Sequence, residues 1–141
     1  MILLDTNVVS ELMRPAPNRQ VVAFIDGHAR THFFLPAPAL AELFAGVELL
    51  PDGRRKADLR GQLQRVADDL FVGRIAPFDE ESARAYGLVI AERTRQGRPI
   101  SVVDAEIAAI ARHTGFAVAT RNLGDFVGLG LALIDPFDKP A

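Results

Sequence analysis

Ile2-Leu3-Leu4-Asp5-Thr6-Asn7 joins three apolar residues directly to a carboxylate and two further polar side chains. A short apolar run bounded by polar residues is typical of a buried strand. Residues 6–13 then predict a short helix that ends near Pro15, because a proline disfavours helical geometry in the residue before it. A strand that leads straight into a helix favours an α/β fold, with Asp5 at the carboxyl end of the first strand.

The rest of the chain continues this alternation of strands and helices. Asn18, Asp79 and Ser101 are of the types that begin helices, and Gly115 stands where a helix would end. Further helices are predicted over residues 18–27, 38–50, 59–70, 79–96 and 101–113, and strands over 2–4, 32–35, 74–76, 116–119 and 131–134. Strands separated by helices imply a central parallel sheet of about five short strands with helices on both faces.

Two of these helices have apolar residues at helical spacing, which indicates the face that each turns to the core. In the helix predicted over 59–70 this stripe consists of Leu59, Leu63, Val66 and Leu70. In the helix predicted over 79–96 we expect the inward residues to be Ala83, Tyr86, Ile90 and Ala91.

Length and composition favour one compact domain over residues 1–141. The chain has 141 residues, of which 49% are hydrophobic and 24% charged, and it has no cysteine. A domain of this size buries enough apolar surface to fold without disulfides or structural zinc. The absence of cysteine from the sequence excludes thiol catalysis, iron–sulfur clusters and disulfide scaffolds, and the composition excludes wholesale disorder.

Net charge and hydropathy limit the binding partners and the cellular location that we expect for the protein. The formal net charge is −2, whereas a purely electrostatic nucleic-acid binder is usually clearly basic. Any work on nucleic acid therefore requires local charge or a bridging metal ion. No apolar run reaches the roughly 18 residues of a membrane span, and no basic segment precedes a long apolar one as in a secretory signal. We expect a cytoplasmic protein with no membrane contact.

Acidic residues recur where predicted strands end or helices begin. Asp5 follows the first strand, Glu42 lies one turn into the helix after the second, Asp104 lies in the first turn of the helix that starts at Ser101, and Asp125 follows the fourth strand. Ligands of parallel α/β sheets bind at the carboxyl ends of the strands. Four carboxylates gathered there repel one another unless they share a divalent cation, and oxygen ligands suit Mg²⁺ or Mn²⁺.

Each acid also has a structural interpretation. Asp5 can cap the helix that follows it, Glu42 can lie on a solvated helix face, and Asp125 can be a turn residue. Ser101-x-x-Asp104 fits a capping box, which requires no catalysis. The helix around Asp104 is nearly all apolar, however, and an unpaired buried carboxylate is costly, which favours a functional role for that residue.

Other enzyme classes leave no matching pattern. The histidines His28, His32 and His113 form no metal-ligand spacing and no nucleophile–base pair. A phosphoacceptor domain needs adjacent acids after the first strand, and a haloacid-type phosphatase needs Asp-x-Asp there. This chain has Asp5-Thr6-Asn7 at that place, so neither class fits.

The acids lie in motifs that resemble those of PIN-domain proteins, in the same order and over nearly the whole chain. The four stretches are Leu4-Asp5-Thr6-Asn7-Val8-Val9-Ser10-Glu11-Leu12, Ala39-Leu40-Ala41-Glu42-Leu43, Asp104-Ala-Glu-Ile-Ala-Ala-Ile-Ala111 and Ala119-Thr120-Arg121-Asn122-Leu123-Gly124-Asp125-Phe126. Arg14-Pro-Ala-Pro-Asn18 and Leu49-Leu50-Pro51 are similar to the FitB-like branch of the VapC toxins.

The resemblance implies a single three-layer PIN domain and a Mg²⁺- or Mn²⁺-dependent endoribonuclease, the toxin of a type II toxin–antitoxin pair. It also implies a homodimer, an RNA substrate and a cognate antitoxin that commonly binds DNA. Its catalytic and metal-binding acids match Asp5, Glu42, Asp104 and Asp125, and its supporting polar residues match Asn7, Thr120 and Asn122. Some FitB-like members carry the fourth carboxylate at the position of Asn122, so Asp125 is the weaker match.

An alternative remains a catalytically inactive PIN fold that acts only by binding a partner or nucleic acid. Loss of an acid would indicate that role, and all the core acids are present. In the enzyme, candidates for contacts to the RNA backbone are Arg14, Arg93, Arg95 and Arg98.

Overall fold

The fold is built on one parallel sheet. The structure is a computed structural model that describes residues 1–138, and within them five strands pair in the order β3-β2-β1-β4-β5, all parallel. The strands are β1 (Ile2–Leu4), β2 (Phe33–Pro36), β3 (Ile75–Ala76), β4 (Ala117–Ala119) and β5 (Leu133–Ile134). The predicted parallel sheet of five short strands is confirmed.

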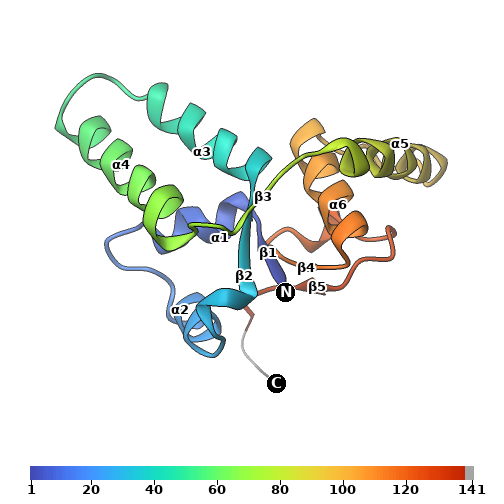
Figure 1. Ribbon diagram of the computed structural model, residues 1–141, viewed down its shortest axis with the longest axis horizontal. Helices are drawn as coiled ribbons and strands as arrows, with labels where there is room; N and C mark the ends of the chain where they lie inside the picture. Colours follow the sequence, from blue (N-terminus) through green and yellow to red (C-terminus); the bar gives the residue numbers. More distant parts are fainter. Residues whose placement is uncertain (139–141) are drawn as a thin grey trace.

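Helices lie on both sides of this sheet (Figure 1). In residues 1–138 they are α1 (Thr6–Leu12), α2 (Arg19–Asp26), α3 (Ala37–Glu48), α4 (Arg54–Arg65), α5 (Glu80–Arg95) and α6 (Val102–Thr114). Right-handed crossovers from β1 through β2 to β3 place α1 to α4 on one side, and the return from β3 to β4 places α5 and α6 on the other. The pairs α3–α4 and α5–α6 form two arms (Figure 1). Within the described range, no helix is both long and apolar enough to cross a membrane.

The predicted helix ends are confirmed by their caps. The side chains of Asp5, Asn18, Asp79 and Ser101 each accept a hydrogen bond from a backbone N–H of the first turn of α1, α2, α5 and α6. Gly115 ends α6 with φ of 76°, a left-handed conformation that glycine adopts without the steric cost of a Cβ. These local signals set where each helix leaves the sheet.

The core lies around the central strand and α6. Leu3 of β1 and Val118 of β4 are fully buried, as are Ile107 and Ile110 of α6. Because α6 is apolar around most of its circumference, it packs against α5 on one side and the sheet on the other. Phe126, fully buried, closes the core beyond β4. The loops that follow β1 and β4 are therefore anchored to well-packed parts of the core.

Two predicted helix faces differ from the structure. Leu70 is exposed, although Leu63 and Val66 of the same predicted stripe are buried. After Arg65 the chain forms a π-helical turn over Val66–Leu70, and the wider turn rotates Leu70 away from the core. In α5 the predicted inward residue Ala83 is exposed, because Ser82, Val89 and Arg93 form the fully buried line instead.

Candidate active site at the carboxyl ends of the strands

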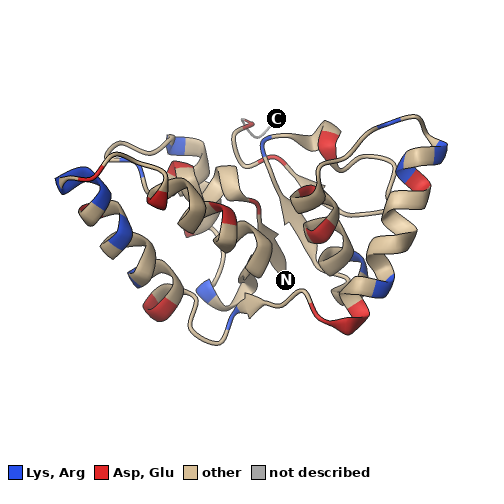
Figure 2. Cartoon of the chain, turned by 90° about the horizontal axis from the view of Figure 1, so that it is seen from above, with Lys and Arg blue, Asp and Glu red and all other residues tan. Residues whose placement is uncertain are grey.

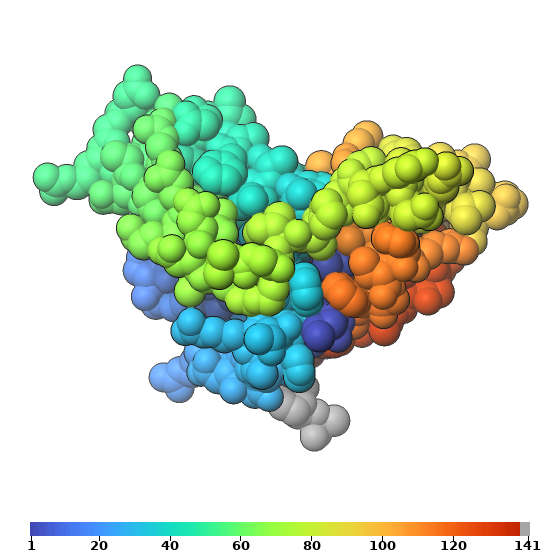
Figure 3. Space-filling view, viewed as in Figure 1, coloured from blue at the N-terminus to red at the C-terminus, as the bar shows by residue number. Residues whose placement is uncertain are grey.

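The candidate site lies between β1 and β4, where the direction in which successive strands are added to the sheet reverses. From β1 the chain proceeds outward to β2 and β3, then returns to β4 on the other side of β1. In such sheets the crevice beyond the carboxyl ends of the two central strands is the usual ligand site. In this chain the outline of the molecule dips between the two arms at that end (Figure 3). Seen from above, acidic positions occur on helices of both arms (Figure 2).

Asp5 is the central carboxylate, directly after β1. Its residue is 5% exposed, and its Oδ1 accepts a hydrogen bond of 2.8 Å from the N–H of Thr6. Its Oδ2 accepts one of 2.8 Å from the Thr120 hydroxyl and one of 3.3 Å from the Asn7 amide. Burial raises the pKa of Asp5, the hydrogen bonds from Thr120 and Thr6 oppose the rise, and the negative charges of Glu42 and Asp125 add to it. Asp5 is therefore fixed in orientation.

The predicted supporting residues surround Asp5. Oδ1 of Asn7 accepts a hydrogen bond of 3.2 Å from the N–H of Arg121, which ties α1 to the segment after β4. Thr120 is fully buried, and its hydroxyl oxygen accepts a hydrogen bond of 3.0 Å from the N–H of Asn122. Asn122 thus contributes its backbone N–H, whereas Asn7 and Thr120 contribute side chains.

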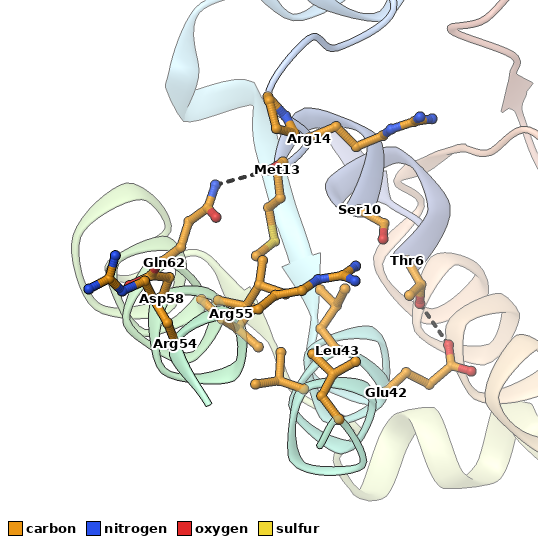
Figure 4. A pocket seen from close by; sticks show the side chains of 16 residues that line it. Thr6, Ser10, Met13, Arg14, Glu42, Leu43, Arg54, Arg55, Asp58 and Gln62 are labelled. Carbon is orange, nitrogen blue, oxygen red and sulfur yellow. Dashed lines mark hydrogen bonds between the residues drawn. The ribbon is translucent and has the colours of Figure 1, made fainter. Parts of the chain in front are cut away.

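Glu42 reaches the crevice from α3. Its Oε1 accepts a hydrogen bond of 2.7 Å from the hydroxyl of Thr6, so the carboxylate is directed toward the end of β1 although the residue itself is exposed (Figure 4). Sequence reasoning missed Thr6. The available signal was its position directly after Asp5, where a hydroxyl on the first turn of α1 faces a helix that starts from the adjacent strand.

Asp104 takes part in the cap of α6 and also lies within electrostatic range of the other acids. Its N–H donates to the hydroxyl oxygen of Ser101 at 3.1 Å, which is the predicted cap of α6. Burial raises the pKa of its carboxyl from the ordinary 3.8 to about 6, opposed by a hydrogen bond from Ser101 and assisted by the charges of Asp5, Asp125 and Glu42. The backbone N–H therefore serves the cap, while the carboxyl interacts with the Ser101 side chain and with the charges of the other acids.

Asp125 lies at the exposed rim of this group. It ends a short 3₁₀ turn, Leu123–Asp125, between β4 and the buried Phe126. Its charge contributes to the raised pKa of both Asp5 and Asp104, so it lies within electrostatic range of both. The structure thus brings all four predicted acids to one end of the sheet.

The donor set of these acids suits a hard divalent cation. Among residues 1–138, no three histidine, cysteine or acidic side chains are close enough together to form a ready-made metal site. The acids instead form an open group, in which burial and the charges of the neighbouring acids raise the pKa of Asp5 and Asp104. Mg²⁺ is usually bound by one or two carboxylates while it keeps several waters. An open group of carboxylate oxygens therefore fits a hydrated Mg²⁺ or Mn²⁺ better than a fully dehydrated ion.

A pocket of about 870 Å³ adjoins the acids between α1, α3 and α4. It shares Thr6 and Glu42 with the site, and Figure 4 shows Arg14 and Arg55 extending from opposite walls. Apolar side chains form much of its lining, namely Met13, Leu43, Val47, Leu50, Leu59 and Leu63. The pocket is thus mainly apolar, with basic side chains and the Glu42 carboxylate at its edge.

The structure corrects one of the candidate RNA contacts. Arg93 is 4% exposed and donates to backbone carbonyls, so it is unavailable to a phosphate group. Arg14, Arg95 and Arg98 are exposed, so their role as RNA contacts stays a prediction.

Comparison with known proteins gives close matches over the full chain. The family model described as PIN domain matches residues 2–126. Toxin FitB of Neisseria gonorrhoeae is 42% identical over 137 residues, which are 97% of this chain and 99% of the relative. The VapC ribonuclease Y4jK of Sinorhizobium fredii is 38% identical over 98% of this chain and 99% of the relative. The structure of FitAB bound to an IR36 DNA fragment has a TM-score of 0.92 at 39% identity, and covers 100% of this chain and 99% of that one.

Proposed function

Because the chain belongs to the PIN domain family, we propose that it is a divalent-metal-dependent endoribonuclease and the toxin of a type II toxin–antitoxin pair. The observation that carries the proposal is the gathering of Asp5, Glu42, Asp104 and Asp125 at the point where the strand order reverses. Relatives named as a toxin and as a VapC ribonuclease support it.

In this proposal Asp5, Glu42 and Asp104 hold Mg²⁺ or Mn²⁺, with Asp125 assisting at the rim. The bound ion would supply activation of a water molecule for hydrolysis of an RNA phosphodiester and neutralisation of the negative charge that develops on it. Thr120 and Asn7 keep the Asp5 carboxylate in one orientation, and Thr6 does so for Glu42. Without a cation the same acids repel the phosphate backbone, which makes binding of RNA depend on the metal.

An antitoxin is the proposed protein partner. The FitAB structure holds a similar chain in an assembly on DNA, which supports a DNA-binding antitoxin for this chain as well. The apolar pocket beside Glu42 suits an apolar segment of such a partner, and a cationic side chain from it would meet the acids. A cytoplasmic homodimer is the proposed working form.

The alternative is a PIN fold that binds without cleaving. The gathering of four acids disfavours it. Burial and the neighbouring negative charges raise the pKa of Asp5 and Asp104, so the group costs folding free energy that a fold serving only to bind would not need to spend. Cleavage assays separate the two.

The test is cleavage of cellular transfer and ribosomal RNA by purified protein free of antitoxin. We compare Mg²⁺ or Mn²⁺ with EDTA, and the unaltered chain with Asp5→Asn. Asp68→Asn is the matched control, because it removes an exposed carboxylate from the π-helical turn. Cleavage that needs metal, fails in Asp5→Asn and persists in Asp68→Asn supports the proposal. Cleavage that survives both EDTA and Asp5→Asn would overturn it.

A further inference from the structure

Arg93 of α5 is a buried cation whose partners are backbone carbonyls. Its Nε donates to the carbonyl of Arg98 at 3.2 Å and its Nη2 to that of Pro99 at 3.2 Å. Its Nη1 donates to the carbonyls of Val127 at 3.0 Å and Gly124 at 3.4 Å. Only 4% of the residue is exposed, so the guanidinium is almost fully removed from water. Its planar group of N–H donors compensates by bonding to all four carbonyls at once.

The carbonyls belong to two separate segments that both lead to acids. Arg98 and Pro99 lie in the connection from α5 to α6, with one residue between Pro99 and the cap residue Ser101, which begins the turn that carries Asp104. Gly124 and Val127 lie on either side of Asp125 and Phe126 in the connection from β4 to β5. One side chain therefore joins the segment that leads to Asp104 to the segment that carries Asp125.

Neighbouring contacts complete this junction. The backbone N–H of Arg98 donates to the carbonyl of Arg93 at 3.0 Å, which folds the connection back over the end of α5. The side-chain amide of Gln96 donates to the carbonyl of Gly128 at 2.7 Å. Gly128 has φ of 83°, a left-handed conformation that glycine adopts without the steric cost of a Cβ. These contacts also hold the end of α5 against the segment that follows Asp125.

We propose that Arg93 is a positioning residue for the acidic group, which sets the spacing of Asp104 from Asp125 and thereby the affinity for the divalent cation. The proposal rests on the metal-dependent function proposed above. Arg93 itself contacts neither carboxylate in the described interactions, so its effect passes through the two backbone segments. Residues that orient metal ligands typically change metal affinity by about 10- to 100-fold when they are removed.

The chain offers a matched control in Arg74. This guanidinium also donates to backbone carbonyls, those of Phe33 at 2.7 Å, Arg30 and Leu70. Phe33 begins β2, so these contacts lie at the amino end of a strand, away from the acids at the carboxyl ends. Loss of Arg74 therefore removes the same kind of hydrogen bond without touching either acidic segment.

The experiment measures Mn²⁺ affinity by titration calorimetry for the unaltered chain, Arg93→Met, Arg93→Lys and Arg74→Met, with unfolding monitored in parallel. We expect Arg93→Met to bind Mn²⁺ at least tenfold more weakly. Arg93→Lys is expected to fall between Arg93→Met and the unaltered chain, because an ammonium group has three donors and lacks the planar fork. If Arg93→Met fails to fold, Arg93→Lys tests the proposal in its place.

Arg74→Met should lose stability but keep its Mn²⁺ affinity. Hydrogen exchange should rise in residues 97–101 and 122–128 for the Arg93 variants alone.

Two results would overturn the inference. If folded Arg93 variants bind Mn²⁺ as tightly as the unaltered chain, or Arg74→Met weakens binding equally, Arg93 serves stability only. If the unaltered chain itself binds no Mn²⁺, the proposed metal-dependent function fails together with this inference. The Mn²⁺ titration of the unaltered chain tells the two cases apart: if this chain binds Mn²⁺, only the role of Arg93 is in question.

Discussion

The hydroxyl of Thr6 donates a hydrogen bond of 2.7 Å to Oε1 of Glu42, 36 residues further along the chain. The N–H of the same residue donates to Oδ1 of Asp5 at 2.8 Å. A single residue at the start of α1 thus orients carboxylates that follow two neighbouring strands. This arrangement makes the relative placement of Asp5 and Glu42 a property of the fold, since α1 and α3 pack against each other.

Thr6→Val should remove the hydrogen bond to Glu42 while it keeps the one to Asp5. The valine keeps the N–H to Asp5 and the shape of the side chain but leaves Glu42 without its hydroxyl partner. A hydrogen bond to a charged group is worth about 1.5–3 kcal/mol, and the exposure of Glu42 places the effect at the lower end. We expect kcat for RNA cleavage to fall about tenfold with little change in melting temperature. Thr6→Ser, which restores a hydroxyl, should recover most activity, and failure to do so would contradict the role of this contact.

Thr120→Val should chiefly affect stability. The buried hydroxyl donates to Asp5 at 2.8 Å and accepts from the N–H of Asn122 at 3.0 Å, so the valine leaves the buried Asp5 carboxylate short of one donor and the N–H of the exposed Asn122 without this acceptor. The loss at the buried carboxylate costs about 1–3 kcal/mol. The pKa of Asp5 should also rise further, because the Thr120 hydrogen bond lowers it. Urea unfolding measures the first effect, with exposed Thr94→Val as the control; equal stability of the two variants would contradict it.

The raised pKa of Asp104 predicts a pH dependence of stability in EDTA. Its pKa is about 6 in the folded chain against an ordinary 3.8, so the folded state binds this proton more tightly than the unfolded state does. The resulting stabilisation is complete below about pH 4 and is lost as pH rises through 6. Asp104→Asn should remove this contribution and raise the melting temperature at pH 7, since asparagine keeps the backbone N–H that caps α6 and an amide oxygen that can accept from the Ser101 hydroxyl. A lower melting temperature for Asp104→Asn at pH 7 would favour a purely structural role.

The acids and caps of this site were predictable from sequence because each depends on local order. Asp5 directly follows an apolar run, and Ser101 precedes an apolar helix, so strand end and helix start are evident without tertiary information. The rule that ligands bind at carboxyl ends of parallel strands then brings distant acids together. The order of the strands, which decides that β1 and β4 are neighbours, follows from the fold class rather than from any one residue.

Arg93 and Thr6 were not predictable in the same way. Arginine is rarely buried, and nothing in the sequence around α5 shows that unpaired carbonyls of two loops converge on one face of the helix. The exposure of Ala83 has the same origin, because the buried face of α5 is set by contact with α6 and those loops rather than by its own weak apolar pattern. Thr6 depends on the approach of α3 to α1, which is again a tertiary relation.

Arg14 has a side chain that is 68% exposed, and it lines the same pocket as Glu42. Its ion pair with Glu11 is long, at 3.5 Å, so the guanidinium is available to a phosphate group of a bound RNA strand. Arg14→Gln should raise KM several-fold with little change in kcat, and should reduce the slope of log affinity against log salt by about one. Exposed Arg19→Gln on α2 is the matched control for loss of one positive charge. Equal effects of both substitutions would show that net charge, rather than a contact beside the acids, governs RNA binding, and would remove the pocket from the path of the strand.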